Sequence, residues 1–102
     1  MNRILQTGQF CQWLKKLRDI KGKTAILKRI ERAKLGNFGD TRPVGEEVRE
    51  MRFFVGPGYR VYYVHHKEVI YILLCGGDKN TQESDIPKAI QLWREIREGI
   101  DD

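Results

Sequence analysis

Three consecutive predicted strands each carry a cation in or beside them, namely Arg52, Arg60 and Lys79. A sheet with a purely structural role more often has threonine or valine at such positions. The guanidinium group of arginine is planar, stays protonated and can donate to two phosphate oxygens at once. These residues therefore predict a phosphate-binding site on the sheet, and the alternative is that they only form ion pairs with nearby glutamates.

Glu50 is the carboxylate best placed to act as a general base at such a site. Because side chains alternate between the two faces of a strand, Glu50 and Arg52 are predicted to share one face. The same closeness makes a plain ion pair an equally good interpretation. His65 and His66 are acid–base candidates by residue type. They lie on the same predicted strand as Arg60 but at its other end, about five residues away, and they point to opposite faces.

Aromatic and basic side chains extend the predicted binding surface. Tyr62 has the strand parity of Arg60 and is the candidate for stacking on a base, whereas Tyr63 is expected in the core. Basic residues cover the outer faces of two predicted helices, where they can hold nucleic-acid phosphates, dock an acidic or amphipathic partner segment, or stay solvated. The helical cations are Lys15, Lys16, Arg18, Lys28, Arg29 and Arg32.

An antiparallel sheet is expected to position the sheet residues. The runs at 48–55, 59–66 and 69–75 are rich in residues that favour strands. The first two runs are separated by Gly56-Pro57-Gly58, which predicts a turn. The third run is apolar at nearly every position, as expected for a central strand covered on both faces. Residues 1–6 are a weaker candidate for a fourth strand.

Two helices are predicted ahead of the sheet. Thr7 caps the first, which ends near Asp19, and Gly22 is expected to break the pattern before a second helix at 23–35. Residues 36–47 contain three glycines and a proline, and therefore predict a loop.

Thr81 is predicted to cap a last helix, in which Ala89 and Trp93 belong to the apolar stripe. The predicted fold class is therefore α+β. It has an N-terminal helical hairpin, an antiparallel sheet of three or four strands and a C-terminal helix. One domain is expected to span residues 1–102.

Composition narrows the class of protein. With 40% hydrophobic and 32% charged residues, the sequence is typical of a globular protein in water. No apolar run approaches the ~20 residues that cross a bilayer, and the N-terminus lacks the apolar core of a signal peptide. Cys11 and Cys75 lack the spacing of a metal site or a disulfide framework. We therefore expect a cytoplasmic protein with reduced thiols, no metal and no cofactor.

The charge is distributed unevenly along the chain. Residues 1–40 contain ten Lys or Arg against three acidic residues, residues 41–80 six against five, and residues 81–102 three against six. A basic first half predicts a polyanionic partner, with nucleic acid favoured over a membrane. Lysine-rich helix surfaces that only keep the protein in solution are the alternative.

Long stretches of the sequence resemble one protein family. The stretches are WLKKLRD, LKRIERAKLGNFGD, RPVGEEVREMRFFVGPGYRVYYV and LLCGGDKNTQESDI. They resemble the RelE/ParE superfamily of toxins, and in particular the HigB-like, phage-associated branch called addiction module killer protein. The resemblance covers about residues 8–92 and implies the small microbial-ribonuclease-like fold of that superfamily.

The resemblance implies a toxin of a type II toxin–antitoxin module. A cognate antitoxin, expected to be a small helix-turn-helix protein from the same operon, would neutralise it. RelE-like members cleave mRNA in the ribosomal A site without a metal, which makes the ribosome and mRNA the expected partners. ParE-like members poison DNA gyrase instead, and an inactive phage-derived remnant that binds RNA or antitoxin is a further alternative.

The family's functional residues are matched in part. Gly58-Tyr59-Arg60 corresponds to the Gly-Tyr-Arg turn of the ribonuclease members, and Arg52 falls on one of two basic positions of the preceding strand. Glu50 falls on the other, and Lys79 approximately matches a basic residue after the last strand. The tyrosine or histidine that some members place near the last helix is missing, and Asp85 lies near that place. The implied catalytic set is therefore Arg60, Arg52, Lys79 and Glu50.

Overall fold

The computed structural model describes residues 1–100, with side chains up to residue 99. It contains three helices and one five-stranded sheet in the order β1-β5-β4-β3-β2. β1 runs parallel to β5, and every other neighbouring pair is antiparallel. The α+β class is confirmed, whereas the predicted count of three or four strands is too low. The elements are β1 (Arg3–Gln6), α1 (Gly8–Lys16), α2 (Ile20–Lys34), β2 (Thr41–Gly45), β3 (Val48–Arg52), β4 (Tyr59–Lys67), β5 (Ile70–Asp78) and α3 (Gln82–Ile100).

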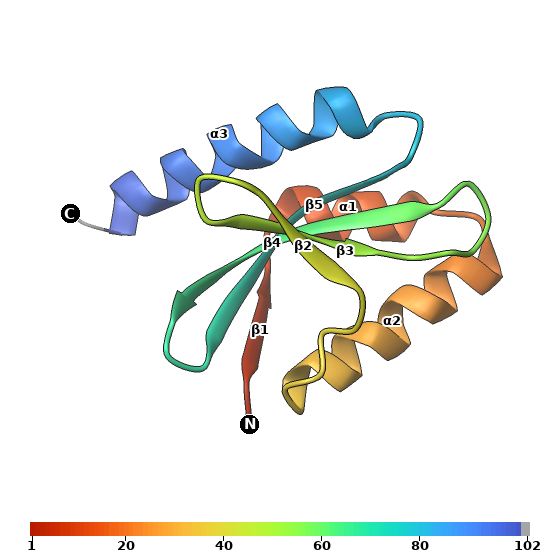
Figure 1. The fold of residues 1–102 in the computed structure, drawn as a ribbon, viewed down its shortest axis with the longest axis horizontal. Coiled ribbons are helices and arrows are strands. Elements are labelled where there is room, and N and C mark those ends of the chain that lie inside the picture. The colour runs from red at the N-terminus through yellow and green to blue at the C-terminus, as the bar shows by residue number, and fades with distance from the viewer. Residues whose placement is uncertain (101–102) are drawn as a thin grey trace.

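Helices cover both faces of the sheet, as Figure 1 shows. On one face Phe10 of α1 and Ile26 of α2 pack against the sheet. On the other face Ala89 and Trp93 of α3 pack against it. β5 contributes to both cores, because Leu73 faces α1 and α2 while its neighbours along the strand face α3. The predicted central strand, covered on both faces, is confirmed.

The alternation predicted for β3 is confirmed. Met51 and Phe53 lie in the core beneath α1 and α2. Val48 lies in the core beneath α3. Since side chains alternate along a strand, Glu50 and Arg52 share the α3 face with Val48.

The segment from 36 to 47 is not the simple loop that its glycines and proline predict. It contains the edge strand β2, which pairs with β3 through a tight turn at Glu46 and Glu47. Both glutamates have positive φ angles, 45° and 72°, in a conformation that Asn and Gly adopt more readily. Their carboxylates pair with Arg94 and Arg97 of α3, so contacts distant in sequence hold this turn.

Gly22 does not separate the two N-terminal helices. α1 is capped by Thr7, as predicted, but it ends at Lys16. α2 begins at Ile20, is capped by Asp19 and passes through Gly22 without a break. The glycine is buried against the ring of Tyr59, with which a Cβ at this position would overlap. The absence of a side chain therefore permits close packing and does not end a helix.

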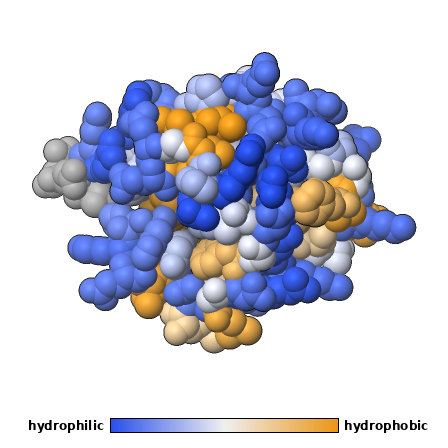
Figure 2. Space-filling model, viewed as in Figure 1, coloured by the Kyte–Doolittle hydropathy of each residue, from blue (hydrophilic) through white to orange (hydrophobic). Residues whose placement is uncertain are grey.

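The surface seen in Figure 2 is mostly hydrophilic, and its hydrophobic residues form separate patches. Among the residues that the structure describes, no helix is both long enough and apolar enough to cross a bilayer.

Candidate functional site

The sheet cations gather where β3 ends and β4 begins. Arg52 and Arg60 are direct partners across the β3–β4 ladder, which places their side chains on the same face. Gly58 lies between Arg60 and Lys79, since a Cβ at Gly58 would be 3.5 Å from both Arg60 Nη1 and Lys79 Cβ. The structure thus brings the three predicted cations to one end of the sheet.

Glu50 lies at the buried centre of this cluster. Its side chain is fully buried and accepts hydrogen bonds from Arg42 Nε at 3.0 Å and Gln82 Nε2 at 2.7 Å. Arg60 Nε lies 3.7 Å from Glu50 Oε1. A substrate hydroxyl has no access to this carboxylate, so the structure argues against the predicted role of general base. Glu50 is instead placed to hold the surrounding donors in position.

Arg42 and Gln82 were not among the residues predicted for the site. Arg42 faces Glu50 across the β2–β3 ladder, and β2 itself was missed. Gln82 comes from the first turn of α3, which lies 32 residues along the chain from Glu50. The order of residues along the chain contains no signal for either contact.

Arg52 and Arg60 each form hydrogen bonds with only part of their guanidinium group. Arg52 Nη2 donates to Asp40 at 2.9 Å, and this hydrogen bond raises the pKa of Arg52. Arg60 Nη1 donates to the carbonyls of Gly58 at 3.1 Å and Tyr59 at 3.2 Å. The Nε atoms of both arginines are buried without a hydrogen-bond partner among the described residues. Unpartnered buried donors are rare in folded proteins and often mark a place that water or a ligand completes.

Tyr62 cannot stack on a base in this structure, which corrects the prediction. Its side chain is fully buried beneath α3, so neither ring face is open. Burial, together with the nearby charges of Glu50 and Asp85, raises the pKa of Tyr62. Its hydroxyl is the third buried polar atom without a partner in this cluster.

Asp85 is the partly exposed carboxylate of the site. It lies in the first turn of α3, and Thr81 donates a hydrogen bond to it. A Cβ on Gly77 would overlap the Asp85 carboxylate, and Gly77 is the strand partner of Arg60. Nearby, burial raises the pKa of Cys75 to about 12, which keeps this thiol protonated and unreactive. Among residues 1–99, no three His, Cys, Asp or Glu side chains group together as a metal site would require.

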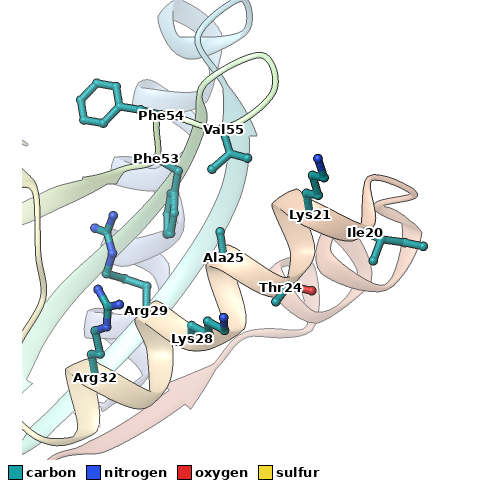
Figure 3. Close-up of a pocket in the computed structure, with 10 residues that line it drawn as sticks. All are labelled: Ile20, Lys21, Thr24, Ala25, Lys28, Arg29, Arg32, Phe53, Phe54 and Val55. Carbon is teal, nitrogen blue, oxygen red and sulfur yellow. The ribbon is translucent and has the colours of Figure 1, made fainter.

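The helical cations form two groups, one at α1 and one along α2. Lys15, Lys16 and Arg18 lie at the end of α1 and just beyond it. The second group, Lys28, Arg29 and Arg32, lines a groove of about 400 Å³ between α2 and residues 53–55. Figure 3 shows the α2 side chains along this groove, with Phe53 and Val55 directed toward the helix.

Arg29 has a structural role in the wall of this groove. Its Nη2 donates to the Arg52 carbonyl at 3.0 Å, and its Nη1 donates to the Phe38 carbonyl at 3.2 Å. The guanidinium carbon lies 4.4 Å from the centre of the Phe53 ring, and burial lowers the pKa of Arg29. This residue therefore has fewer free donors for a partner than Lys28 or Arg32.

Comparison with known proteins identifies a family and a relative that match most of the chain. Residues 12–94 match the sequence model of the family described as phage derived protein Gp49-like. An uncharacterized protein of Haemophilus influenzae is 45% identical over 94 residues, which cover 92% of this chain and 95% of that protein.

Proposed function

Because this chain belongs to the family of phage-derived Gp49-like proteins, we propose that it is the toxin of a type II toxin–antitoxin module. The family membership and the resemblance of its motifs to the RelE/ParE superfamily support the proposal. Two helices cover one face of the sheet, and Arg52 at the end of β3 and Arg60 at the start of β4 share the other face. This arrangement is compatible with the RelE-like fold.

The proposed activity is ribosome-dependent cleavage of mRNA. The observation that carries it is the cross-strand pair Arg52 and Arg60, whose buried Nε atoms lack partners. In metal-independent cleavage the 2′-oxygen attacks phosphorus, the bond to the 5′-oxygen breaks, and the 5′-oxygen takes a proton. Arg52, Arg60 and Lys79 would stabilise the charge that develops on the phosphate oxygens. Asp85, beside the strand partner of Arg60, would accept the proton of the 2′-hydroxyl.

A reconstituted translation assay tests this activity. Primer extension would map breaks in a programmed mRNA with and without ribosomes, and we expect cleavage at the A site only with ribosomes. Lys79→Ala and Asp85→Asn should each slow cleavage by about 10²-fold or more, judged by what single transition-state donors contribute. Arg94→Ala is the matched control, because Arg94 is an exposed cation of α3 that pairs with Glu46, and this variant should cleave mRNA normally. Intact mRNA at a toxin level that arrests growth would refute the proposed activity.

One observation favours a second candidate, a gyrase poison on the same fold. Glu50 is fully buried and already accepts from Arg42 and Gln82, and Arg60 donates to backbone carbonyls, so few groups of the cluster remain free for acid–base chemistry. Growth arrest with intact mRNA, together with inhibited DNA supercoiling by purified gyrase, would establish this alternative.

The lining of the groove along α2 is suited to an acidic segment of the antitoxin, which is the partner that we propose for it. Lys21, Lys28 and Arg32 line it, and none of them forms an ion pair with another described residue. Val55 and Ala25 add apolar surface between the cations. Lys28→Glu combined with Arg32→Glu should weaken the complex with the antitoxin of the same operon at least about tenfold. Lys15→Glu combined with Lys16→Glu is the control outside the groove, and equal losses in both variants would exclude the groove.

A further inference from the structure

Phe54 is the one aromatic residue that the structure leaves exposed among residues 1–99. Its side chain is 81% exposed, whereas the rings of Phe53 and Tyr59 beside it are buried. A single exposed apolar residue is common on protein surfaces and needs no function by itself. The exposure of Phe54 is informative because the residue lies next to the cation cluster.

The ring of Phe54 lies beside the guanidinium group of Arg52. The guanidinium carbon is 6.0 Å from the ring centre. Figure 3 shows that Phe53 points toward α2 while Phe54 points away from it. Phe54 therefore lies at the edge of the α2 groove, which it helps to line, and its ring extends from there toward Arg52 (Figure 3).

We propose that Phe54 and Arg52 form a nucleotide subsite, in which a base of a single-stranded RNA stacks on the phenyl ring and Arg52 binds the adjacent phosphate. The inference rests on the proposed function, since it assigns RNA to the cation cluster. Sites for single-stranded nucleic acid combine an aromatic platform with a cation that follows the backbone. Phe54 thus takes the stacking role that the sequence had suggested for the buried Tyr62.

The surroundings of Phe54 fit a base better than a protein partner. The residues that follow along the chain, Gly56 and Pro57, are exposed, and the neighbouring apolar side chains of Phe53 and Val55 are directed toward α2 (Figure 3). A protein interface needs a larger contiguous patch, whereas one base needs only one ring face. Arg52 keeps a buried Nε without a partner, and its side chain is 33% exposed, so a phosphate can reach the guanidinium group.

The test uses the full chain and an RNA that carries 2-aminopurine, whose fluorescence falls when the base stacks. Blocking 2′-O-methyl groups prevent cleavage, and the RNA is presented free and in the A site of a programmed ribosome. We expect quenching with the natural protein. Phe54→Ala should abolish the quenching and weaken binding about tenfold, in line with the effect of removing one stacking ring.

Two further variants make the result specific. Phe54→Trp keeps an aromatic face and should restore both quenching and affinity. Leu35→Ala removes another strongly exposed apolar side chain, 75% exposed at the end of α2, and should behave like the natural protein. Unchanged quenching in Phe54→Ala, or no quenching with any protein, would overturn the subsite.

Cleavage kinetics separate this subsite from the proposed function. With cleavable mRNA, Phe54→Ala should raise KM about tenfold and leave kcat nearly unchanged, because stacking contributes equally to the ground and transition states. Normal cleavage with an unchanged KM in Phe54→Ala would remove the subsite and leave the function intact. Quenching that depends on Phe54 without any cleavage would retain the subsite and refute the nuclease activity.

Discussion

The hydroxyl of Tyr59 donates a hydrogen bond to Asp19 Oδ2 over 2.8 Å, which ties the start of β4 to the N-terminus of α2. Asp19 Oδ1 at the same time accepts from the Gly22 amide at 3.1 Å. Burial and this hydrogen bond raise the pKa of Tyr59 to about 12, so the tyrosine remains a donor at neutral pH. Because Arg60 follows Tyr59 directly, the contact helps to fix the strand that carries the candidate site.

Removal of the Tyr59 hydroxyl should destabilise the fold. We expect Tyr59→Phe to lower the free energy of unfolding by about 1 kcal/mol, the typical net effect of one hydrogen bond. Urea denaturation followed by circular dichroism measures this change. Tyr71→Phe is the matched control, since its hydroxyl forms no hydrogen bond with another described residue. Equal stability of Tyr59→Phe and the natural protein would show that the bond contributes nothing.

The Asp19 carboxylate should make stability depend on acidic pH. The Gly22 amide and, to a lesser extent, the Tyr59 hydroxyl lower the pKa of Asp19 below its ordinary value of 3.8. The carboxylate therefore contributes its full stabilisation above that value, and the contribution is lost as the pH falls through the lower pKa of the folded state. Asp19→Asn keeps a capping oxygen without the charge. The difference in unfolding free energy between the natural protein and Asp19→Asn should become smaller as the pH falls from 6 to 3. A difference that stays constant over this range would contradict the assignment.

Gly22 should not tolerate a methyl group, although alanine is the better helix former. A Cβ at this position would overlap the Tyr59 ring, so Gly22→Ala should cost about 1–3 kcal/mol through overpacking. Gly8→Ala is the matched control in α1, because a Cβ there would meet no atom within 4 Å. The melting temperature of Gly22→Ala should therefore lie several degrees below that of Gly8→Ala. A Gly22→Ala variant as stable as Gly8→Ala would exclude the packing explanation.

Local patterns predicted the elements whose signals lie within a few residues. The apolar alternation of β3, the apolar run of β5 and the cap at Thr7 all depend on neighbouring positions, and the structure contains each of them. Thr81 directly precedes α3 as predicted, but its hydroxyl donates to Asp85 and does not accept from an amide of the first helical turn. The edge strand β2 was missed because two glutamates form its turn at positive φ, held by arginines of α3. Gly22 was misjudged because the ring that requires its missing side chain comes from β4.

The cations of the candidate site could be predicted from the sequence, but the burial of the residues around them could not. Strand alternation places Glu50, Arg52 and Arg60 on one face, and the structure has them there. Alternation carries no information on depth, however. α3 covers Tyr62 and Glu50, whereas Phe54 is exposed, and this difference in burial exists only in the folded chain.

Glu50 gives the strongest test of the buried charge cluster. Its carboxylate is fully buried, contacts Arg42 and Gln82, and lies 3.7 Å from Arg60 Nε. Removing one partner of a buried ion pair leaves an uncompensated charge, so Glu50→Gln should lower the free energy of unfolding by about 3 kcal/mol. Glu46→Gln removes a charge from an exposed pair and should change stability little. In the Glu50→Gln background, Arg60→Met should cost less than it does alone, because the unpaired guanidinium is then removed. Additive effects in this double-mutant cycle, measured by urea denaturation, would show that Glu50 does not hold Arg60 in place.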